Sequence, residues 1–123
     1  MAEKRLGAVE ARFAQIIWDN EPLSSRELVD LCAAQLNWKK STTYTVLKKL
    51  CERGIFQNEN GTVVSRMGRD DFYAEGGTRF VAESYEGSLP AFLAAFISRN
   101  GLTEQEADEI QRMIDEYKEK NAE

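Results

Sequence analysis

The sequence contains no histidine, and it has only two cysteines and two prolines among 123 residues. Without histidine the chain lacks the commonest general base and the commonest metal ligand. It also has no phosphate-binding glycine loop and no nucleophile with a suitable base beside it. Asp70 and Asp71 stand at the start of an expected helix, where the helix dipole stabilises carboxylates. These absences indicate a protein that is not an enzyme and that uses no cofactor or metal.

The two cysteines, Cys32 and Cys51, lie within expected helices and lack the spacing of metal ligands. We expect buried thiols that act as small apolar side chains. A redox-sensing pair is the alternative role for these two residues.

Long apolar runs are also missing. No segment approaches the roughly 18 apolar residues of a membrane-spanning helix, and there is no signal-peptide pattern. We therefore expect a cytoplasmic protein without direct membrane insertion. Its 42% content of hydrophobic residues suffices for one compact domain, or for a small domain followed by an assembly segment.

The most informative segment that is present runs from residue 38 to residue 54. On a helix over residues 41–53, Thr43, Val46, Leu47 and Leu50 share one stripe. The other side carries hydroxyls that can reach base edges and cations that suit phosphates. With neighbouring cations, the candidate DNA-binding residues are Lys39, Lys40, Ser41, Thr42, Tyr44, Thr45, Lys48, Lys49, Arg53 and Arg66.

The surrounding pattern predicts a winged helix-turn-helix over residues 1–68. A helix over 8–20 has the apolar stripe Val9, Phe13, Ile16 and Ile17. Leu23 is expected to add a short strand edge. Ser24 and Glu27 form a capping box for a second helix, which ends near Leu36 and buries Leu28, Val29, Leu31 and Cys32. Trp38 is expected to anchor the following turn by packing, and a hairpin over 55–59 and 62–67 turns at Asn60-Gly61.

The distribution of charge is compatible with DNA binding although the net charge is −5. Residues 37–66 carry a net charge of +4, whereas residues 100–123 carry −5. Phosphates respond to charges within a Debye length of roughly 10 Å, so the local charge matters more than the total. Such an asymmetry is typical of a DNA-binding module joined to a module with another role.

Residues 69–123 are expected to form a helical dimerisation domain. We expect a helix over 70–85 to bend or break at Gly76-Gly77, because each glycine costs roughly 1 kcal/mol relative to alanine. Ser88 and Thr103 cap two further amphipathic helices, which are too short to bury both apolar stripes against each other. A second copy of the chain is the economical partner. The candidate interface residues are Leu89, Phe92, Leu93, Phe96, Ile97, Ile110, Met113, Ile114 and Tyr117.

From Leu6 to about Tyr117, the chain resembles the penicillinase repressor family. The resemblance rests on the order and spacing of several short stretches. They are Ile17-Trp18, Pro22-Leu23-Ser24, Trp38 with Thr42 and Thr45, Leu47-x-x-Leu50-x-x-x-Gly54-Ile55, Gly87-Ser88-Leu89, Phe96 and Leu102-Thr103.

The resemblance implies a dimeric repressor of transcription that binds a pseudo-palindromic operator in double-stranded DNA. Positions matching Ser41, Thr42 and Thr45 approach bases in that family. Its antibiotic-resistance members are cleaved by a membrane sensor protease at an Asn-Phe bond, whose counterpart here is Ala95-Phe96. Copper-responsive members have a C-terminal cysteine cluster, which residues 100–123 lack.

Winged helices also serve as protein–protein adaptors, and the acidic surplus of the chain suits that alternative. A mobility-shift assay in the presence of competitor DNA distinguishes an adaptor from a sequence-specific repressor.

Overall fold

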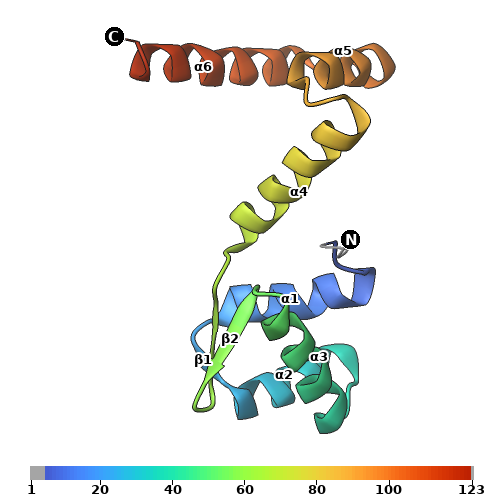
Figure 1. Ribbon diagram of the computed structural model, residues 1–123, viewed down its shortest axis with the longest axis vertical. Helices are drawn as coiled ribbons and strands as arrows, with labels where there is room; N and C mark the ends of the chain where they lie inside the picture. The colour runs from blue at the N-terminus through green and yellow to red at the C-terminus, as the bar shows by residue number, and fades with distance from the viewer. Residues whose placement is uncertain (1–4, 123) are drawn as a thin grey trace. The chain divides into compact units, whose positions relative to one another are not determined.

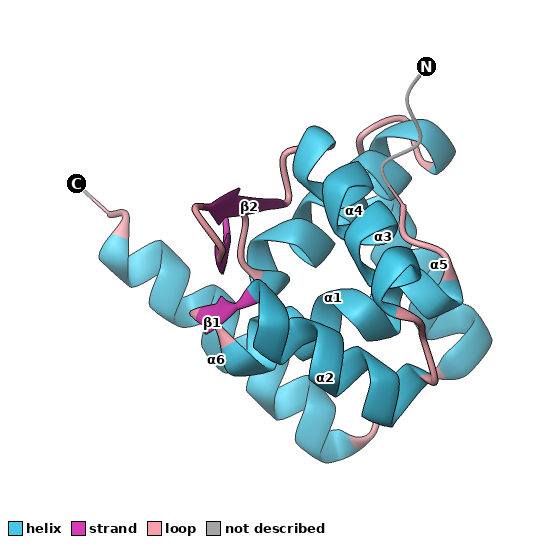
Figure 2. Cartoon of the chain, turned by 90° about the horizontal axis from the view of Figure 1, so that it is seen from below, coloured by secondary structure: helices cyan, strands magenta, loops and turns pink. Residues whose placement is uncertain are grey.

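The computed structural model describes residues 5–122, which are mainly helical with one small antiparallel sheet (Figures 1 and 2). The elements in chain order are α1 (Ala8–Asn20), β1 (Leu23–Ser24), α2 (Ser25–Leu36), α3 (Lys40–Glu52), β2 (Phe56–Glu59), β3 (Thr62–Ser65), α4 (Arg69–Ser84), α5 (Leu89–Asn100) and α6 (Glu104–Lys120). The chain divides into two compact units, the first ending at Arg79 and the second beginning at Phe80. This confirms the predicted fold class, a winged helix-turn-helix followed by a helical module.

In the first unit, α1 has the predicted bounds and buries Phe13, Ile16 and Ile17 as expected. The prediction for Val9 was wrong, because its side chain is 51% exposed. Val9 lies in the first turn of α1, at the edge of its buried side. Ala14 is fully buried instead.

The predicted capping box at the start of α2 is present. The backbone N–H of Glu27 donates to Ser24 Oγ at 3.0 Å, and the backbone N–H of Ser24 donates to Glu27 Oε1 at 2.8 Å. Leu28 and Cys32 are buried, whereas Val29 and Leu31 are only half-buried. The helix ends at Leu36, and Asn37 caps it with a left-handed φ of 58°.

Trp38 fixes the turn between α2 and α3 by packing, as predicted. Its ring stacks on Phe13 of α1, with 5.4 Å between the ring centroids. This contact sets the start of α3 against the first helix. In Figure 1, α1, α2 and α3 gather with the hairpin alongside them.

The sheet has the strand order β1-β3-β2, and both pairings are antiparallel. Leu23 pairs with Val63, which confirms the short strand edge expected there. Asn60 and Gly61 have φ values of 54° and 90°, as the predicted type I′ turn requires. Phe56 and Val63 are fully buried and attach the hairpin to the helical core.

Helix α4 continues without interruption through Gly76-Gly77, so the expected break is not found. The turns on both sides hold the helix. Thr78 Oγ1 donates to the carbonyl of Ala74, and Arg79 pairs with Glu75 at 3.2 Å. The ion pair recovers only about 0.2–0.5 kcal/mol of the roughly 1 kcal/mol that each glycine costs, so the helix is continuous but locally weaker.

In the second unit, Ser88 caps α5, and Thr103 and Glu106 form the predicted capping box of α6. The ring of Phe92 lies 5.7 Å from that of Phe80 and 5.5 Å from that of Tyr85. Within residues 89–120, all of which the structure describes, no residue of α5 or α6 is fully buried. The apolar stripes of this unit therefore remain open to solvent.

Candidate nucleic-acid interface

The exposed side of α3 carries the hydroxyls and both lysines that the sequence placed there. Thr43, Leu47 and Leu50 are buried and hold the helix in the core. On the opposite side, the exposed residues are Ser41, Thr42, Tyr44, Thr45, Lys48 and Lys49. Because the buried stripe fixes the rotation of α3, these polar side chains point to solvent together.

The N-terminus of α3 has a charge pattern that opposes the preference of the helix dipole. Lys39 and Lys40 are both exposed there, although the dipole favours acidic residues at this end. Among the described residues, no side chain caps the free backbone N–H groups of this turn. A DNA phosphate would satisfy those N–H groups and neutralise the lysines at the same time. The pattern is unfavourable for an isolated helix and favourable for a phosphate contact.

The first turn of α2 lies beside the exposed side of α3. Tyr44 Oη donates to Ser25 Oγ at 3.3 Å, and the backbone N–H of Ser25 donates to the carbonyl of Gly61 at 2.8 Å. The start of α2 thus links α3 to the tip of the hairpin, and it also presents the exposed side chain of Arg26. Ser25 and Arg26 are candidate contacts that the periodicity of the sequence does not identify. The layout of a helix-turn-helix, in which the first helix crosses the DNA backbone, was the available signal.

Two of the candidate cations are held at the other end of α3. Lys49 Nζ lies 3.0 Å from Glu10 Oε2, and Arg53 Nη1 lies 3.9 Å from Glu10 Oε1. Arg53 also donates to the backbone carbonyl of Arg5 at 3.0 Å. The structure therefore groups Lys49 and Arg53 with α1, apart from Lys39, Lys40 and Lys48.

The Glu10 contacts predict a pH dependence of stability. The hydrogen bond from Lys49, then that from the backbone of Gly7, hold the pKa of Glu10 below its usual value. A lowered folded-state pKa gives stability that is present above the unfolded-state pKa and is lost as pH falls through the folded-state pKa. We expect Glu10→Gln to lower the unfolding free energy at neutral pH by at most about 1 kcal/mol, because Lys49 is well exposed. Urea unfolding at pH 7 and pH 3 should show the difference at pH 7 only, and an equal difference at both pH values would contradict this role.

Arg66 and the hairpin differ from α3 in their position and in their charge. Arg66 follows the last residue of β3, so it lies at the opposite end of the hairpin from Asn60-Gly61. Glu59 is the single charged residue within positions 56–65. The tip of the wing is therefore polar. Arg66 lies near the C-terminal end of α3, where its backbone N–H donates to the carbonyl of Ile55 at 2.8 Å.

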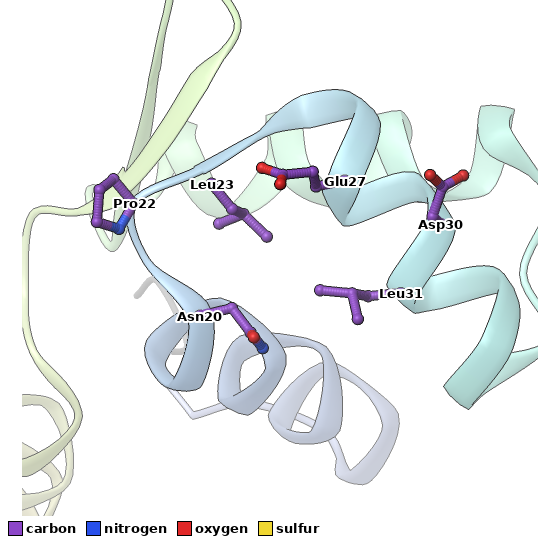
Figure 3. Close-up of a pocket in the computed structure, with 6 residues that line it drawn as sticks. All are labelled: Asn20, Pro22, Leu23, Glu27, Asp30 and Leu31. Atoms are coloured by element: carbon purple, nitrogen blue, oxygen red, sulfur yellow. The ribbon is translucent and has the colours of Figure 1, made fainter.

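A pocket of about 340 Å³ lies between the end of α1, β1 and α2 (Figure 3). Its lining residues are Asn20, Pro22, Leu23, Glu27, Asp30 and Leu31. Asn20 Nδ2 donates to the carbonyl of Ile16, and Glu27 belongs to the capping box, so both side chains already serve the fold. The pocket includes no residue of α3 and is separate from the candidate DNA-contacting side.

Both cysteines are free thiols, with Cys32 buried and Cys51 half-buried. Burial raises the pKa of each thiol above its ordinary value, which keeps both protonated and poorly nucleophilic. Across residues 5–122 there is also no cluster of three or more residues suited to holding a metal ion.

Comparisons with known proteins agree with this architecture. A family model described as penicillinase repressor matches residues 6–116. The chain is 20% identical to the penicillinase repressor of Bacillus licheniformis, over 97% of this chain and 96% of that protein. It is 19% identical to the methicillin resistance regulatory protein MecI of Staphylococcus aureus strain Mu50, over 89% and 92% of the two chains. The corresponding MecI protein of Mammaliicoccus sciuri is 18% identical, with the same coverage. No helix among the described residues has the length and apolar character needed to span a membrane.

Proposed function

We propose, since the chain belongs to the penicillinase repressor family, that it represses transcription as a homodimer bound to a pseudo-palindromic operator. The family is one of transcriptional repressors rather than enzymes. Residues 1–68 form the DNA-binding domain in this proposal, and residues 69–123 form the dimerisation domain. The first half of α4 packs on the DNA-binding domain through Phe72 and Tyr73.

The proposal is supported mainly by the exposed side of α3 and by its N-terminus, which has two lysines and no side-chain cap among residues 5–122. Ser41, Thr42 and Thr45 have side chains short enough to contact base edges in the major groove. Lys39 and Lys40 lie at the first turn, where no side chain of the described part of the chain accepts a hydrogen bond from the free backbone N–H groups. Phosphate contacts of this kind position a protein on DNA, and base contacts then give specificity.

The exposed apolar side chains of the second unit support the proposal of a dimer. The large side chains of this unit that are at least 41% exposed are Phe80, Leu89, Phe96, Ile97, Met113, Ile114 and Tyr117. A monomer would leave this apolar surface in water, whereas a second copy could cover the same surface by an isologous contact. Two DNA-binding domains held together contact two half-sites and multiply specificity.

In this proposal, a membrane sensor protease that cuts the second unit, or a ligand that binds it, relieves repression. Ala95 and Phe96 are both exposed on α5, and Phe96 belongs to the proposed interface. A cut between them would divide α5 and remove part of the dimer contact. Operator affinity would then fall because each DNA-binding domain would bind alone.

A mobility-shift assay tests the proposed function. The duplex is one enriched from a random library by the full-length chain, and unrelated duplex is added in excess. A repressor keeps a discrete complex under these conditions. Loss of the complex to competitor would overturn sequence-specific binding and favour the adaptor role.

Thr45 and Lys48 should affect that assay differently. Thr45→Ala removes a methyl and a hydroxyl suited to base contact. It should therefore reduce the difference in binding free energy between operator and random DNA by roughly 1–3 kcal/mol. Lys48→Ala removes a phosphate contact and should weaken binding to both DNAs about equally. Competition titrations with the two DNAs measure both effects. If the two variants behave alike on both DNAs, the assignment of these roles is wrong.

A further inference from the structure

Gly76 and Gly77 lie side by side within α4, and the geometry of the helix does not require glycine at either position. Neither glycine has a positive φ. A methyl group built on either residue would meet no neighbouring atom within 4 Å. Alanine would therefore fit at both positions and would favour the helix more strongly than glycine does. The consequence of the two glycines is a locally weaker helix.

This weak point lies between two parts of α4 that are anchored by aromatic contacts. Before it, the rings of Phe72 and Tyr73 each lie 5.9 Å from Trp18 of α1. After it, the ring of Phe80 lies 5.7 Å from that of Phe92 in α5. The division between the two compact units follows directly, at Arg79. The glycines thus separate the anchored halves of a helix that belongs to both units.

We propose that Gly76 and Gly77 form a joint in α4 that lets the two DNA-binding domains of a dimer adjust their separation and orientation. The two residues thereby determine how many half-site spacings the repressor accepts. This inference rests on the proposed function, because half-sites matter only to a dimer that binds DNA. One inserted base pair moves a half-site by about 3.4 Å and rotates it by roughly 35°. A helix that opens at the glycines can absorb such a change, whereas a stiffer helix resists it.

The test compares the full-length wild type with the double variant Gly76→Ala/Gly77→Ala. Ser98→Ala serves as the control, because Ser98 is exposed and belongs to a different helix, α5. Hydrogen exchange of the amides flanking the glycines should slow by about fivefold for each alanine introduced. Nitrogen-15 relaxation should give two different tumbling times for the two units of the wild type and more similar times in the double variant. The control should match the wild type in both measurements.

The DNA measurement uses duplexes whose half-sites stand at the enriched spacing or one base pair closer or farther. We expect the wild type to tolerate the altered spacings, and the double variant to lose roughly a further tenfold in affinity on them. Equal spacing tolerance in the wild type and the double variant would overturn the inference. So would equal tumbling times of the two units in the wild type. If the wild type binds no duplex selectively, the proposed function fails, and the relaxation data still decide whether the glycines form a joint.

Discussion

Substituting Phe96 with aspartate is expected to convert the proposed dimer to a monomer and to abolish operator binding. Phe96 is 45% exposed, and its ring lies 5.9 Å from that of Phe92. In the proposed interface the second copy covers this ring, so aspartate would bury an unpaired carboxylate at a cost of several kcal/mol. Sedimentation velocity at micromolar concentration measures the change of oligomeric state, and a mobility-shift assay measures the loss of binding.

Two controls separate this effect from unfolding. Ala94→Asp places the same charge on the opposite, exposed side of α5 and should leave the dimer intact. Both tryptophans of the chain, Trp18 and Trp38, pack within the first unit, so their fluorescence reports whether that unit stays folded. A Phe96→Asp protein that remains dimeric at micromolar concentration would show that α5 does not form the interface.

The second large effect is the salt dependence of binding. Operator affinity should fall by about a thousandfold between roughly 50 and 200 mM salt. Lys39, Lys40 and Lys48 are exposed in each chain, so a dimer can neutralise about six phosphates. The slope of the logarithm of the association constant against the logarithm of the salt concentration should therefore be about −5. Fluorescence anisotropy with a labelled operator measures this slope.

Lysine variants test which cations produce that slope. Lys48→Ala should reduce its magnitude by roughly 2, because the dimer loses two phosphate contacts. Lys118→Ala removes an equal charge from α6, a helix of the second unit that contains none of the candidate DNA-binding residues, and should leave the slope unchanged. A slope near zero in the wild type would contradict phosphate binding by these lysines.

Local signals in the sequence accounted for most of the fold. The capping boxes at Ser24 and Thr103 fixed the starts of two helices, because each satisfies backbone donors within four residues. Asn60-Gly61 fixed the hairpin, because few residue pairs adopt positive φ at both positions. Such signals depend on neighbouring residues, and a single sequence contains them in full.

The features that sequence analysis missed depend on residues far apart in the chain. Glu10 pairs with Lys49 across 39 positions, and no helical periodicity reveals that contact. The exposure of Val9 depends on how much of the first turn of α1 the rest of the core covers, which the periodicity of its own helix does not reveal. The unbroken α4 depends on anchors on both sides of its glycines, whereas helix propensity describes only the glycines themselves.

In the proposed function, two copies of the exposed side of α3 bind one operator. Selection of duplexes from a random library by the full-length wild type, followed by sequencing, is the decisive measurement. We expect an enriched pseudo-palindrome whose two half-sites lie about one helical turn, or a multiple of it, apart. Recovery of unenriched sequences, or of a single half-site without its symmetric partner, would contradict it.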